Sequence, residues 1–214
     1  MKKIAIIDYG FGNIKSVLNA LHYLNVQAFV INNCTSEILN FDGLILPGVG
    51  AFKPAIDFLH DQGFDKAILD YVNCGKMLYG ICLGFQLLFD ISYENGKHQG
   101  LGLIHGEVRQ FIQKDNFLKV PHMGWNNISI INQNLYTRSM FNNILNEESF
   151  YFVHSYYAVP YNVSQVSSVC TFGIQFCSSI SYKNIWGSQF HPEKSGEKGL
   201  QILRNFIDEV NINK

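Results

Sequence analysis

The stretch LYGICLGFQLLF, from Leu78 to Phe89, places a cysteine between two glycines and between two apolar runs. The segment KMLYGI before Cys82 is typical of a short buried strand, and CLGFQLLFDI has the spacing of a helix. The sequence therefore predicts a strand that ends at Cys82 and a helix that begins there. A cysteine in such a place is either a small buried side chain or a nucleophile.

The same alternation of strand and helix precedes this stretch. Short apolar runs predict strands at Lys3–Ile7, Gln27–Ile31 and Gly43–Leu46. Helical spacing predicts helices over about 14–24 and 51–73. Strands that alternate with helices form right-handed βαβ units, so the N-terminal half predicts a parallel sheet.

The C-terminal half is rich in β-branched and aromatic residues, and several segments alternate as antiparallel strands do. These segments are GEVRQFI, NISIIN, SFYFVHSYYAV, VSSVCTF, GIQFCSSISY and NIWGSQF. A last helix is expected from about Ser195 to Val210, and the polar region 132–148 is expected at the periphery. No linker or repeat divides the chain, so residues 1–214 are expected to form a single α/β domain with antiparallel strands added in its C-terminal half.

Composition excludes several classes of protein. The 214 residues carry a formal net charge of -1, and 15% of them are charged. The chain as a whole therefore lacks the excess of basic residues that is typical of nucleic-acid-binding proteins. No apolar stretch reaches about 18 residues, so no membrane-spanning helix is predicted. The start MKKIAIIDYG indicates a first strand rather than a signal peptide, because Asp8 and Gly10 come too early for an apolar signal region.

The cysteines are odd in number and include no Cys-x-x-Cys pair; they are Cys34, Cys74, Cys82, Cys170 and Cys177. This pattern argues against a disulfide framework and against a zinc site, and it favours a reducing, cytoplasmic location. We accordingly expect no metal and no cofactor.

The position of Cys82 suits a nucleophile. A thiolate at the start of a helix faces the positive end of the helix dipole. Gly80 and Gly84 allow a sharp turn and a close approach of substrate, as in nucleophile elbows, and the amide of Leu83 could donate to an oxyanion. On this stretch alone, a buried structural thiol stays an equal alternative.

A nucleophilic cysteine needs a base, and GSQFHPEK supplies His191 with Glu193 two residues later. Residues two apart in an extended segment point to the same side, so Glu193 can accept a hydrogen bond from the imidazole and fix its orientation. The alternative is a strand-end turn with a capped histidine. The spacing does not itself show that His191 reaches Cys82.

The segment LPGVGAF, from Leu46 to Phe52, is a third candidate element. Glycines on both sides of Val49 allow a peptide to rotate, so an amide at Val49 or Gly50 could complete an oxyanion hole. The alternative is a plain strand-to-helix turn. A phosphate loop fits poorly, because no Gly-Lys-Ser/Thr follows.

Three of these segments, GICLGFQ, LPGVGAF and QFHPEKS, resemble the motifs of the class I (triad) glutamine amidotransferases. DYGFGNIKSV, PHMGWN and YFVHSYY narrow the resemblance to the HisH family, the glutaminase subunits of imidazole glycerol phosphate synthase. The resemblance extends from Ile4 to about Phe206. It implies a flavodoxin-like, mostly parallel sheet with helices on both faces, and an enzyme that hydrolyses glutamine to glutamate and ammonia.

The resemblance implies a role for each matching residue. Cys82 is the nucleophile, His191 the general base and then acid, and Glu193 the carboxylate that orients it. The amides of Leu83 and Val49 hold the oxyanion, that of Val49 after a peptide flip. The residues expected to hold the amino-acid end of glutamine are Gln86, Glu94, Ser155 and Tyr156; for the first two the alternative is solvated helix surface.

Free ammonia is useful only if it avoids bulk water, which argues for a partner that receives it directly. Members of the family dock as a heterodimer on a (β/α)₈-barrel synthase subunit of the HisF type, in histidine biosynthesis. The resemblance puts Asn13, Met123, Trp125, Asn126 and Lys194 at or near that interface. Trp125 is either an interface anchor or a core tryptophan.

Some positions depart from the family pattern, such as Phe85 and the run Cys177-Ser178-Ser179. They leave open a paralogue that supplies ammonia to a different barrel, for example for amidation of a surface-polysaccharide sugar. Two other classes remain, a non-enzymatic protein with a structural Cys82 and a hydrolase or chaperone of a related flavodoxin-like fold. The late His-Pro-Glu favours the amidotransferase over both.

Overall fold

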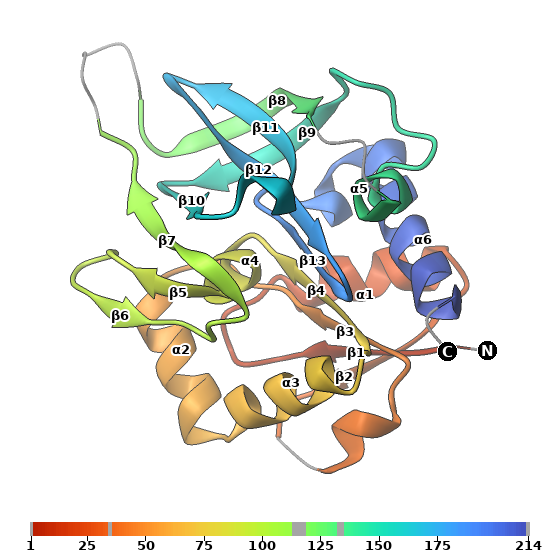
Figure 1. The fold of residues 1–214 in the computed structure, drawn as a ribbon. Helices are drawn as coiled ribbons and strands as arrows, with labels where there is room; N and C mark the ends of the chain where they lie inside the picture. Colours follow the sequence, from red (N-terminus) through yellow and green to blue (C-terminus); the bar gives the residue numbers. More distant parts are fainter. Residues whose placement is uncertain (1, 34–35, 113–118, 132–134, 213–214) are drawn as a thin grey trace.

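The structure, a computed structural model, describes residues 2–33, 36–112, 119–131 and 135–212. Its centre is a parallel sheet in the order β2-β1-β3-β4-β13 (Figure 1). The strands are β1 (Lys3–Ile7), β2 (Gln27–Ile31), β3 (Gly43–Leu46), β4 (Met77–Ile81) and β13 (Ile185–Ser188). Strands covered on both faces need continuous apolar runs, as in β1 and β3, whereas the edge strand β2 is partly exposed. All three have the bounds that the sequence predicted.

Helices cover both faces of this sheet, as predicted. α1 (Ile14–Tyr23) and α6 (Gly196–Ile212) bury their apolar residues in one core cluster. α2 (Phe52–Asp61) and α3 (Phe64–Asn73) bury theirs in the cluster on the opposite face. The predicted α/β class, with helices on the two sides of the sheet, is confirmed (Figure 1).

Two helices differ from the sequence predictions. Region 51–73 forms α2 and α3 rather than one helix, because Gly63 adopts a left-handed φ of 73° between them. The helix after Cys82 is only α4 (Leu83–Leu87), and the chain returns to a strand at β5 (Phe89–Ser92). Short apolar runs suit a buried helix and a buried strand equally well, and here that ambiguity was resolved wrongly.

The C-terminal half adds antiparallel strands, as predicted. They extend the sheet from β13 through β12 and β10 to β7, while β11 pairs with β12 and β8, and β8 with β9. Beyond β7 the sheet continues with β5, which is parallel to β7, and with β6, which is antiparallel to β5. The segment SFYFVHSYYAV is divided at Ser155 into two strands. The bounds are β6 (His98–Gln99), β7 (Ile104–Gln110), β8 (His122–Ile130), β9 (Ser149–His154), β10 (Tyr156–Pro160), β11 (Val166–Phe172) and β12 (Ile174–Tyr182).

The region 132–148 is less peripheral than expected. It contains α5 (Leu135–Met140), and Met140 and Phe141 are buried. The carbonyl of Met140 accepts a hydrogen bond from the side-chain amide of Asn205 in α6 at 2.9 Å. Residues 132–134 lie outside the described residues. The 3-10 helices are η1 (Ser36–Asn40), η2 (Val163–Gln165) and η3 (Pro192–Lys194).

The carboxyl ends of β1, β3, β4 and β13 lie at the same edge of the sheet, because these strands are parallel. The amide of Cys82 donates to the carbonyl of Ser188 at 2.7 Å, which ties the end of β4 to the end of β13. Open α/β sheets bind their ligands outside the carboxyl ends of the strands. This edge is therefore where a functional site is expected.

The turn from β4 into α4 holds Cys82 in an unusual conformation, with φ 55° and ψ -105°. A non-glycine residue at positive φ is strained and often marks a functional site. The flanking glycines are required by space: a Cβ at Gly84 would overlap the carbonyl oxygen of Leu46, and one at Gly80 would lie 2.8 Å from the carbonyl oxygen of Gly84. The sharp elbow that the sequence predicted is thus present.

In the part of the chain that the structure describes, no helix is both long and apolar enough to cross a membrane. Cys74, Cys82, Cys170 and Cys177 are free thiols, as expected, and Cys34 lies outside the described residues. Burial raises the pKa of Cys170 to about 12 and raises that of Cys177 further, so neither is a candidate nucleophile at neutral pH.

Gly84→Ala should destabilise the fold by more than about 3 kcal/mol, because the new methyl group meets backbone that cannot move without separating β3 from α4. Gly63→Ala is the matched control: nothing lies near its added Cβ, so only the strain of a left-handed φ of about 1 kcal/mol is expected. Urea unfolding of both variants measures the difference. Equal losses would show that the contact with Leu46 is unimportant.

Candidate active site

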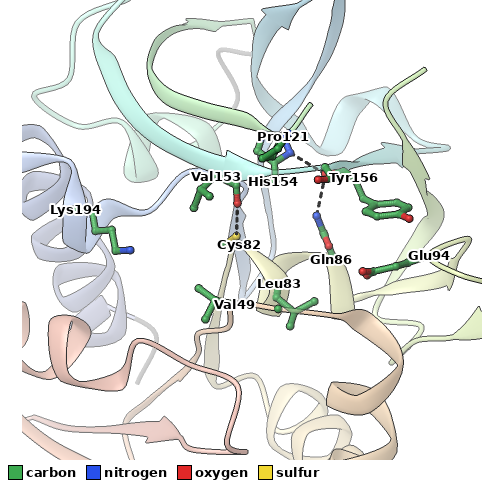
Figure 2. Close-up of a pocket in the computed structure, with 12 residues that line it drawn as sticks. Val49, Cys82, Leu83, Gln86, Glu94, Pro121, Val153, His154, Tyr156 and Lys194 are labelled. Carbon is green, nitrogen blue, oxygen red and sulfur yellow. Dashed lines mark hydrogen bonds between the residues drawn. The ribbon is translucent and has the colours of Figure 1, made fainter. Parts of the chain in front are cut away.

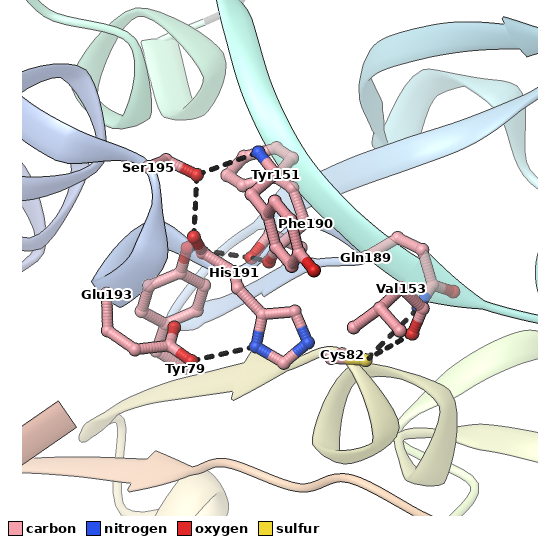
Figure 3. Close-up of polar contacts among 10 residues, drawn as sticks. Tyr79, Cys82, Tyr151, Val153, Gln189, Phe190, His191, Glu193 and Ser195 are labelled. Carbon is pink, nitrogen blue, oxygen red and sulfur yellow. Dashed lines mark hydrogen bonds and ion pairs between the residues drawn. The ribbon is translucent and has the colours of Figure 1, made fainter. Parts of the chain in front are cut away.

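Glu193, His191 and Cys82 lie in a row at the carboxyl edge of the sheet (Figure 3). Nδ1 of His191 is 2.7 Å from Oε1 of Glu193, and both side chains are 2% exposed. The other ring nitrogen, Nε2, faces the sulfur of Cys82 without a hydrogen bond in this state. The three residues that the sequence singled out as a triad are therefore brought together by the fold.

The charges in this row favour a protonated His191. Burial alone would lower the pKa of the imidazole, but the charge and direct approach of Cys82, together with the hydrogen bond to Glu193 and its charge, outweigh burial and raise the pKa to about 10. Such a histidine carries a proton at neutral pH and can give it to a leaving group. The carboxylate of Glu193 holds the ring in place while it does so.

The backbone around His191 is fixed by short hydrogen bonds (Figure 3). The amide of His191 donates to the carbonyl of Tyr151 at 2.9 Å. The hydroxyl of Ser195 donates to the carbonyl of His191 at 2.6 Å and accepts from the amide of Tyr151 at 3.0 Å. These contacts attach the start of η3 to β9, so the ring has little freedom to turn away from Cys82.

Two groups near the sulfur were missed by the sequence analysis. The side-chain amide of Gln189 donates to Sγ of Cys82 at 3.7 Å, and the carbonyl of Val153 lies 3.9 Å from the same sulfur. Gln189 is fully buried, and its Oε1 accepts from Nε2 of Gln86 at 2.9 Å. A signal for Gln189 existed, since it precedes His191 by two residues and can point to the same side.

A cavity of about 460 Å³ opens beside Cys82, within the usual size range for small-molecule sites (Figure 2). Seven of its lining residues in addition to Cys82 are the predicted oxyanion and substrate-binding candidates: Val49, Gly50, Leu83, Gln86, Glu94, Ser155 and Tyr156. Lys194, which was expected at the partner interface, lines it as well. The oxyanion candidates and the substrate-binding candidates thus share one cavity with the nucleophile candidate.

The two amides predicted to hold an oxyanion are both occupied by backbone acceptors. The amide of Val49 donates to the carbonyl of Phe11 at 2.7 Å, away from Cys82. The amide of Leu83 donates to the carbonyl of Gly48 at 3.3 Å. A single peptide, Gly48–Val49, therefore presents its carbonyl to Leu83 and turns its N–H away. In this orientation only a rearrangement of that peptide could present both amides to a substrate.

Gln86 and Glu94 are not solvated helix surface, which was the alternative for them. Gln86 is 5% exposed, and its Nε2 also donates to the carbonyl of Tyr156 at 3.0 Å, so its oxygen stays available to a ligand. Glu94 lies in a turn after β5, where Oε2 accepts from the amide of Phe52 at 2.8 Å. Burial raises the pKa of Glu94 despite this bond.

A pair of buried histidines, also missed, extends from the cavity to β8. Nδ1 of His154 donates to the carbonyl of Tyr156 at 2.8 Å, which leaves its Nε2 to accept from Nδ1 of His122 at 2.9 Å. Nε2 of His122 then accepts from the side-chain amide of Asn126 at 3.2 Å. Burial lowers the pKa of His154 to about 3 and that of His122 to about 4, so both are neutral.

The candidate partner residues lie on the surface near the cavity. Met123 is 66% exposed and Trp125 is 59% exposed, so the alternative of a core tryptophan is wrong. The ring of Trp125 meets that of Tyr151 edge to face at 6.2 Å, and the ammonium of Lys194 lies 5.8 Å from the Tyr151 ring centre. The side chains of Trp125, Tyr151 and Lys194 form a continuous row.

Two further partner candidates are less clearly placed for contact. The side chain of Asn126 is engaged inside the chain, since its amide also donates to the carbonyl of Thr171 at 3.0 Å. Asn13 precedes α1, is partly exposed and makes no side-chain capping bond. Among residues 2–33, 36–112, 119–131 and 135–212, no group of three His, Cys, Asp or Glu side chains could hold a metal ion.

Comparisons with known proteins agree on one family. The profile of the family described as "Glutamine amidotransferase class-I" matches residues 5–210. The chain is 41% identical over 206 residues to imidazole glycerol phosphate synthase subunit HisH of Chlorobaculum tepidum, covering 96% of this chain and 99% of that protein. It is 43% identical over 206 residues to imidazole glycerol phosphate synthase hisHF, chloroplastic, of Arabidopsis thaliana, covering 95% of this chain and 34% of that longer protein.

A solved structure supports the fold. The crystal structure of a glutamine amidotransferase from Thermotoga maritima matches with a TM-score of 0.65 at 13% identity, covering 99% of this chain and 84% of that chain. At this level of identity the match concerns the architecture, which is the flavodoxin-like fold that the sequence resemblance implied.

The proton on His191 can be observed directly. Because its pKa is raised to about 10, His191 should carry protons on both ring nitrogens at pH near 7.5 and lose one only as the pH rises through about 10. His122 and His154 should carry one proton each at the same pH. Proton–nitrogen correlation NMR of the imidazoles distinguishes these forms.

Glu193→Gln should lower the pKa of His191, since the variant removes a charge that favours the imidazolium. Glu197→Gln, an exposed carboxyl in the first turn of α6, is the matched control and should leave the spectrum unchanged. A neutral His191 at neutral pH in the unaltered chain would contradict the charge arrangement described above.

Proposed function

The chain belongs to the class I glutamine amidotransferases and, within them, to the HisH family of imidazole glycerol phosphate synthase subunits, and from this membership we propose that Cys82, His191 and Glu193 form its catalytic triad. The observation that carries the proposal is the row of these three side chains beside a cavity of about 460 Å³. The chain is a glutamine-hydrolysing subunit of a histidine-pathway enzyme. A single glutaminase domain over residues 1–214 and a cytoplasmic location are parts of the same proposal.

The proposed chemistry uses the charges of the row. The thiolate of Cys82 attacks the side-chain amide carbon of glutamine and forms a tetrahedral oxyanion. His191 gives its Nε2 proton to the leaving nitrogen, and ammonia departs as the thioester forms. His191 then takes a proton from water, the hydroxide attacks the thioester, and glutamate leaves with the Cys82 thiolate restored. Gln189 donates to the sulfur and steadies it between these steps.

Substrate recognition in this proposal falls to the polar lining of the cavity. The oxygen of Gln86 can accept from the ammonium group of glutamine, because its nitrogen is already engaged twice. The carboxylate of Glu94 adds a negative charge that suits the same ammonium. Ser155 and Tyr156 line the cavity beside them.

The oxyanion requires the Gly48–Val49 peptide to turn over. In the described orientation its carbonyl accepts the hydrogen bond of the Leu83 amide. The oxyanion of the tetrahedral intermediate would therefore face a carbonyl oxygen instead of two N–H donors. A rotated peptide directs the Val49 amide into the cavity and frees that of Leu83. Glutamine hydrolysis is therefore slow in the resting chain and is accelerated by whatever favours the rotated peptide.

A barrel subunit is the proposed source of that acceleration and the receiver of ammonia. The row of Trp125, Tyr151 and Lys194 is the kind of surface that anchors a partner, since aromatic and long basic side chains often dominate interfaces. Lys194 also lines the cavity, which places the anchor next to the reacting groups. The longer Arabidopsis thaliana relative, in which the matched part is 34% of the protein, is consistent with such a pairing.

The paralogue alternative is not favoured. Relatives that match nearly the whole chain carry the imidazole glycerol phosphate synthase name, including one from Chlorobium luteolum that is 45% identical over 206 residues, covering 96% of this chain and 99% of that protein. The departures at Phe85 and at residues 177–179 lie in buried positions and leave the triad intact. The family assignment also argues against the two other classes, a non-enzymatic protein and a hydrolase or chaperone of a related fold.

The proposal is tested by glutamate release from glutamine, first by the chain alone and then with the barrel protein of the histidine pathway and its ribotide ligand. We expect strong stimulation in the complete mixture. Cys82→Ser should lower glutamate release at least about a thousandfold while the ammonia-dependent reaction of the complex persists. Cys74→Ser, which alters an exposed free thiol, should release glutamate normally.

Two results would contradict the proposal. If Cys82→Ser folds normally but loses the ammonia-dependent reaction as well, the division of labour between the two proteins is wrong. If the unaltered chain is not stimulated, although Cys82 still reacts with the glutamine analogue diazo-oxo-norleucine, the partner is a different barrel with another acceptor.

A further inference from the structure

The hydroxyl of Tyr9 is buried beside the Gly48–Val49 peptide and has no partner among the described residues. Tyr9 follows β1 and is 1% exposed, and its hydroxyl oxygen makes no hydrogen bond to that part of the chain. A Cβ at Gly48 would overlap this oxygen, so the hydroxyl lies against the Gly48 backbone. Buried polar groups are nearly always hydrogen-bonded, and an unpaired one at a moving part calls for a physical reason.

The orientation of the peptide accounts for the unpaired hydroxyl. The carbonyl of Gly48 is held by the amide of Leu83, and the amide of Val49 is held by the carbonyl of Phe11. The ring of Tyr9 lies next to that of Phe11, with centroids 6.1 Å apart. When the peptide turns over, both hydrogen bonds break and the Gly48 carbonyl swings away from Leu83. It then needs a new donor in a place that water does not reach freely.

We propose that the Tyr9 hydroxyl is that donor, and that it hydrogen-bonds to the Gly48 carbonyl only in the turned-over peptide. A bond present in one orientation and absent from the other shifts the equilibrium between them by its own strength. Tyr9 thereby favours the orientation in which the Val49 amide faces the oxyanion. It is a positioning residue that acts through the backbone, and this inference rests on the proposed glutaminase function.

The surroundings of Tyr9 suit a donor. Its ring belongs to the apolar cluster beneath the site, which fixes the hydroxyl in place. Burial, together with the charge of Cys82, raises the pKa of Tyr9 well above its ordinary value, so the hydroxyl keeps its proton throughout the working range of the enzyme. Gly48 is needed at the contact because a side chain would displace the hydroxyl from the peptide.

Tyr9→Phe removes only this hydroxyl and is the decisive variant. We expect the rate constant for glutamine hydrolysis at saturation to fall about five- to tenfold, the size of effect expected for one neutral hydrogen bond, with KM for glutamine unchanged. The thermal stability of the isolated chain should not fall, because the hydroxyl has no partner among the described residues of the resting fold. The ammonia-dependent reaction of the complex should also be unchanged.

Two controls separate this role from others. Tyr71→Phe removes a buried hydroxyl that donates to the carbonyl of Phe41 at 3.2 Å, so it should lower thermal stability and leave hydrolysis unchanged. Iodoacetamide alkylates a thiolate without a tetrahedral intermediate, and its rate at Cys82, followed by peptide mass spectrometry, should be equal in Tyr9→Phe and the unaltered chain.

Three results would overturn the inference while leaving the glutaminase function in place. They are hydrolysis by Tyr9→Phe at the unaltered rate, a loss of thermal stability that reveals a resting partner, or slower alkylation of Cys82 that shows an action on the sulfur. If the unaltered chain with its partner releases no glutamate, the proposed function itself fails and this inference fails with it.

Discussion

The close contact between Gly84 and the carbonyl of Leu46 is the constraint on which the site depends. No Cβ fits between them, so α4 begins directly against the end of β3. This approach brings the amide of Leu83 to the Gly48 carbonyl and turns Cys82 into a strained conformation with its sulfur at the cavity. A larger residue at Gly84 would separate Cys82 from the segment that we propose stabilises its reaction intermediate.

The same closeness lets the chain occupy its own oxyanion site. One peptide satisfies both of its polar groups by bonding to Leu83 and Phe11, which makes the resting orientation stable. The proposed triad, by contrast, is already assembled, since Glu193 holds His191 and the raised pKa keeps the imidazole charged. In the proposed function, control of hydrolysis therefore lies in this one backbone peptide and not in the side chains of the proposed triad. On this proposal, the chain hydrolyses little glutamine until a receiver of ammonia favours the turned-over peptide.

Much of this could be predicted from the sequence, for local reasons. The strands Lys3–Ile7 and Gly43–Leu46 are short apolar runs that suit burial on both faces. Gln27–Ile31 is an edge strand that is only partly buried, but its β-branched and aromatic residues also favour a strand. The contact of His191 with Glu193 was predicted from a two-residue spacing in extended chain. The contact is present, but Glu193 lies in η3, so the turn after His191 and not an extended segment brings the two side chains together. The resemblance then supplied the connection to Cys82, which the spacing alone could not provide. The left-handed Gly63 between α2 and α3 was missed because the helical pattern continues on both sides of it.

Other features could not be predicted because they depend on contacts between distant segments. The neutral pair His122 and His154 exists only because β8 and β9 are neighbours. The roles inferred for Gln189 and Tyr9 depend on the atoms that these side chains contact across the site. Neither residue type indicates such a role from the sequence alone. These side chains do not enter the reaction as nucleophile, acid or base, so no pattern of reactive residues points to them.

The most direct test of control by the Gly48–Val49 peptide is a crystal structure of the chain bound to its barrel partner, with diazo-oxo-norleucine attached to Cys82. We predict that the ketone oxygen of the adduct accepts hydrogen bonds from the amides of Val49 and Leu83, with the Gly48 carbonyl turned away. An adduct formed while the Val49 amide still donates to the carbonyl of Phe11 would contradict the claim that this peptide controls the reaction.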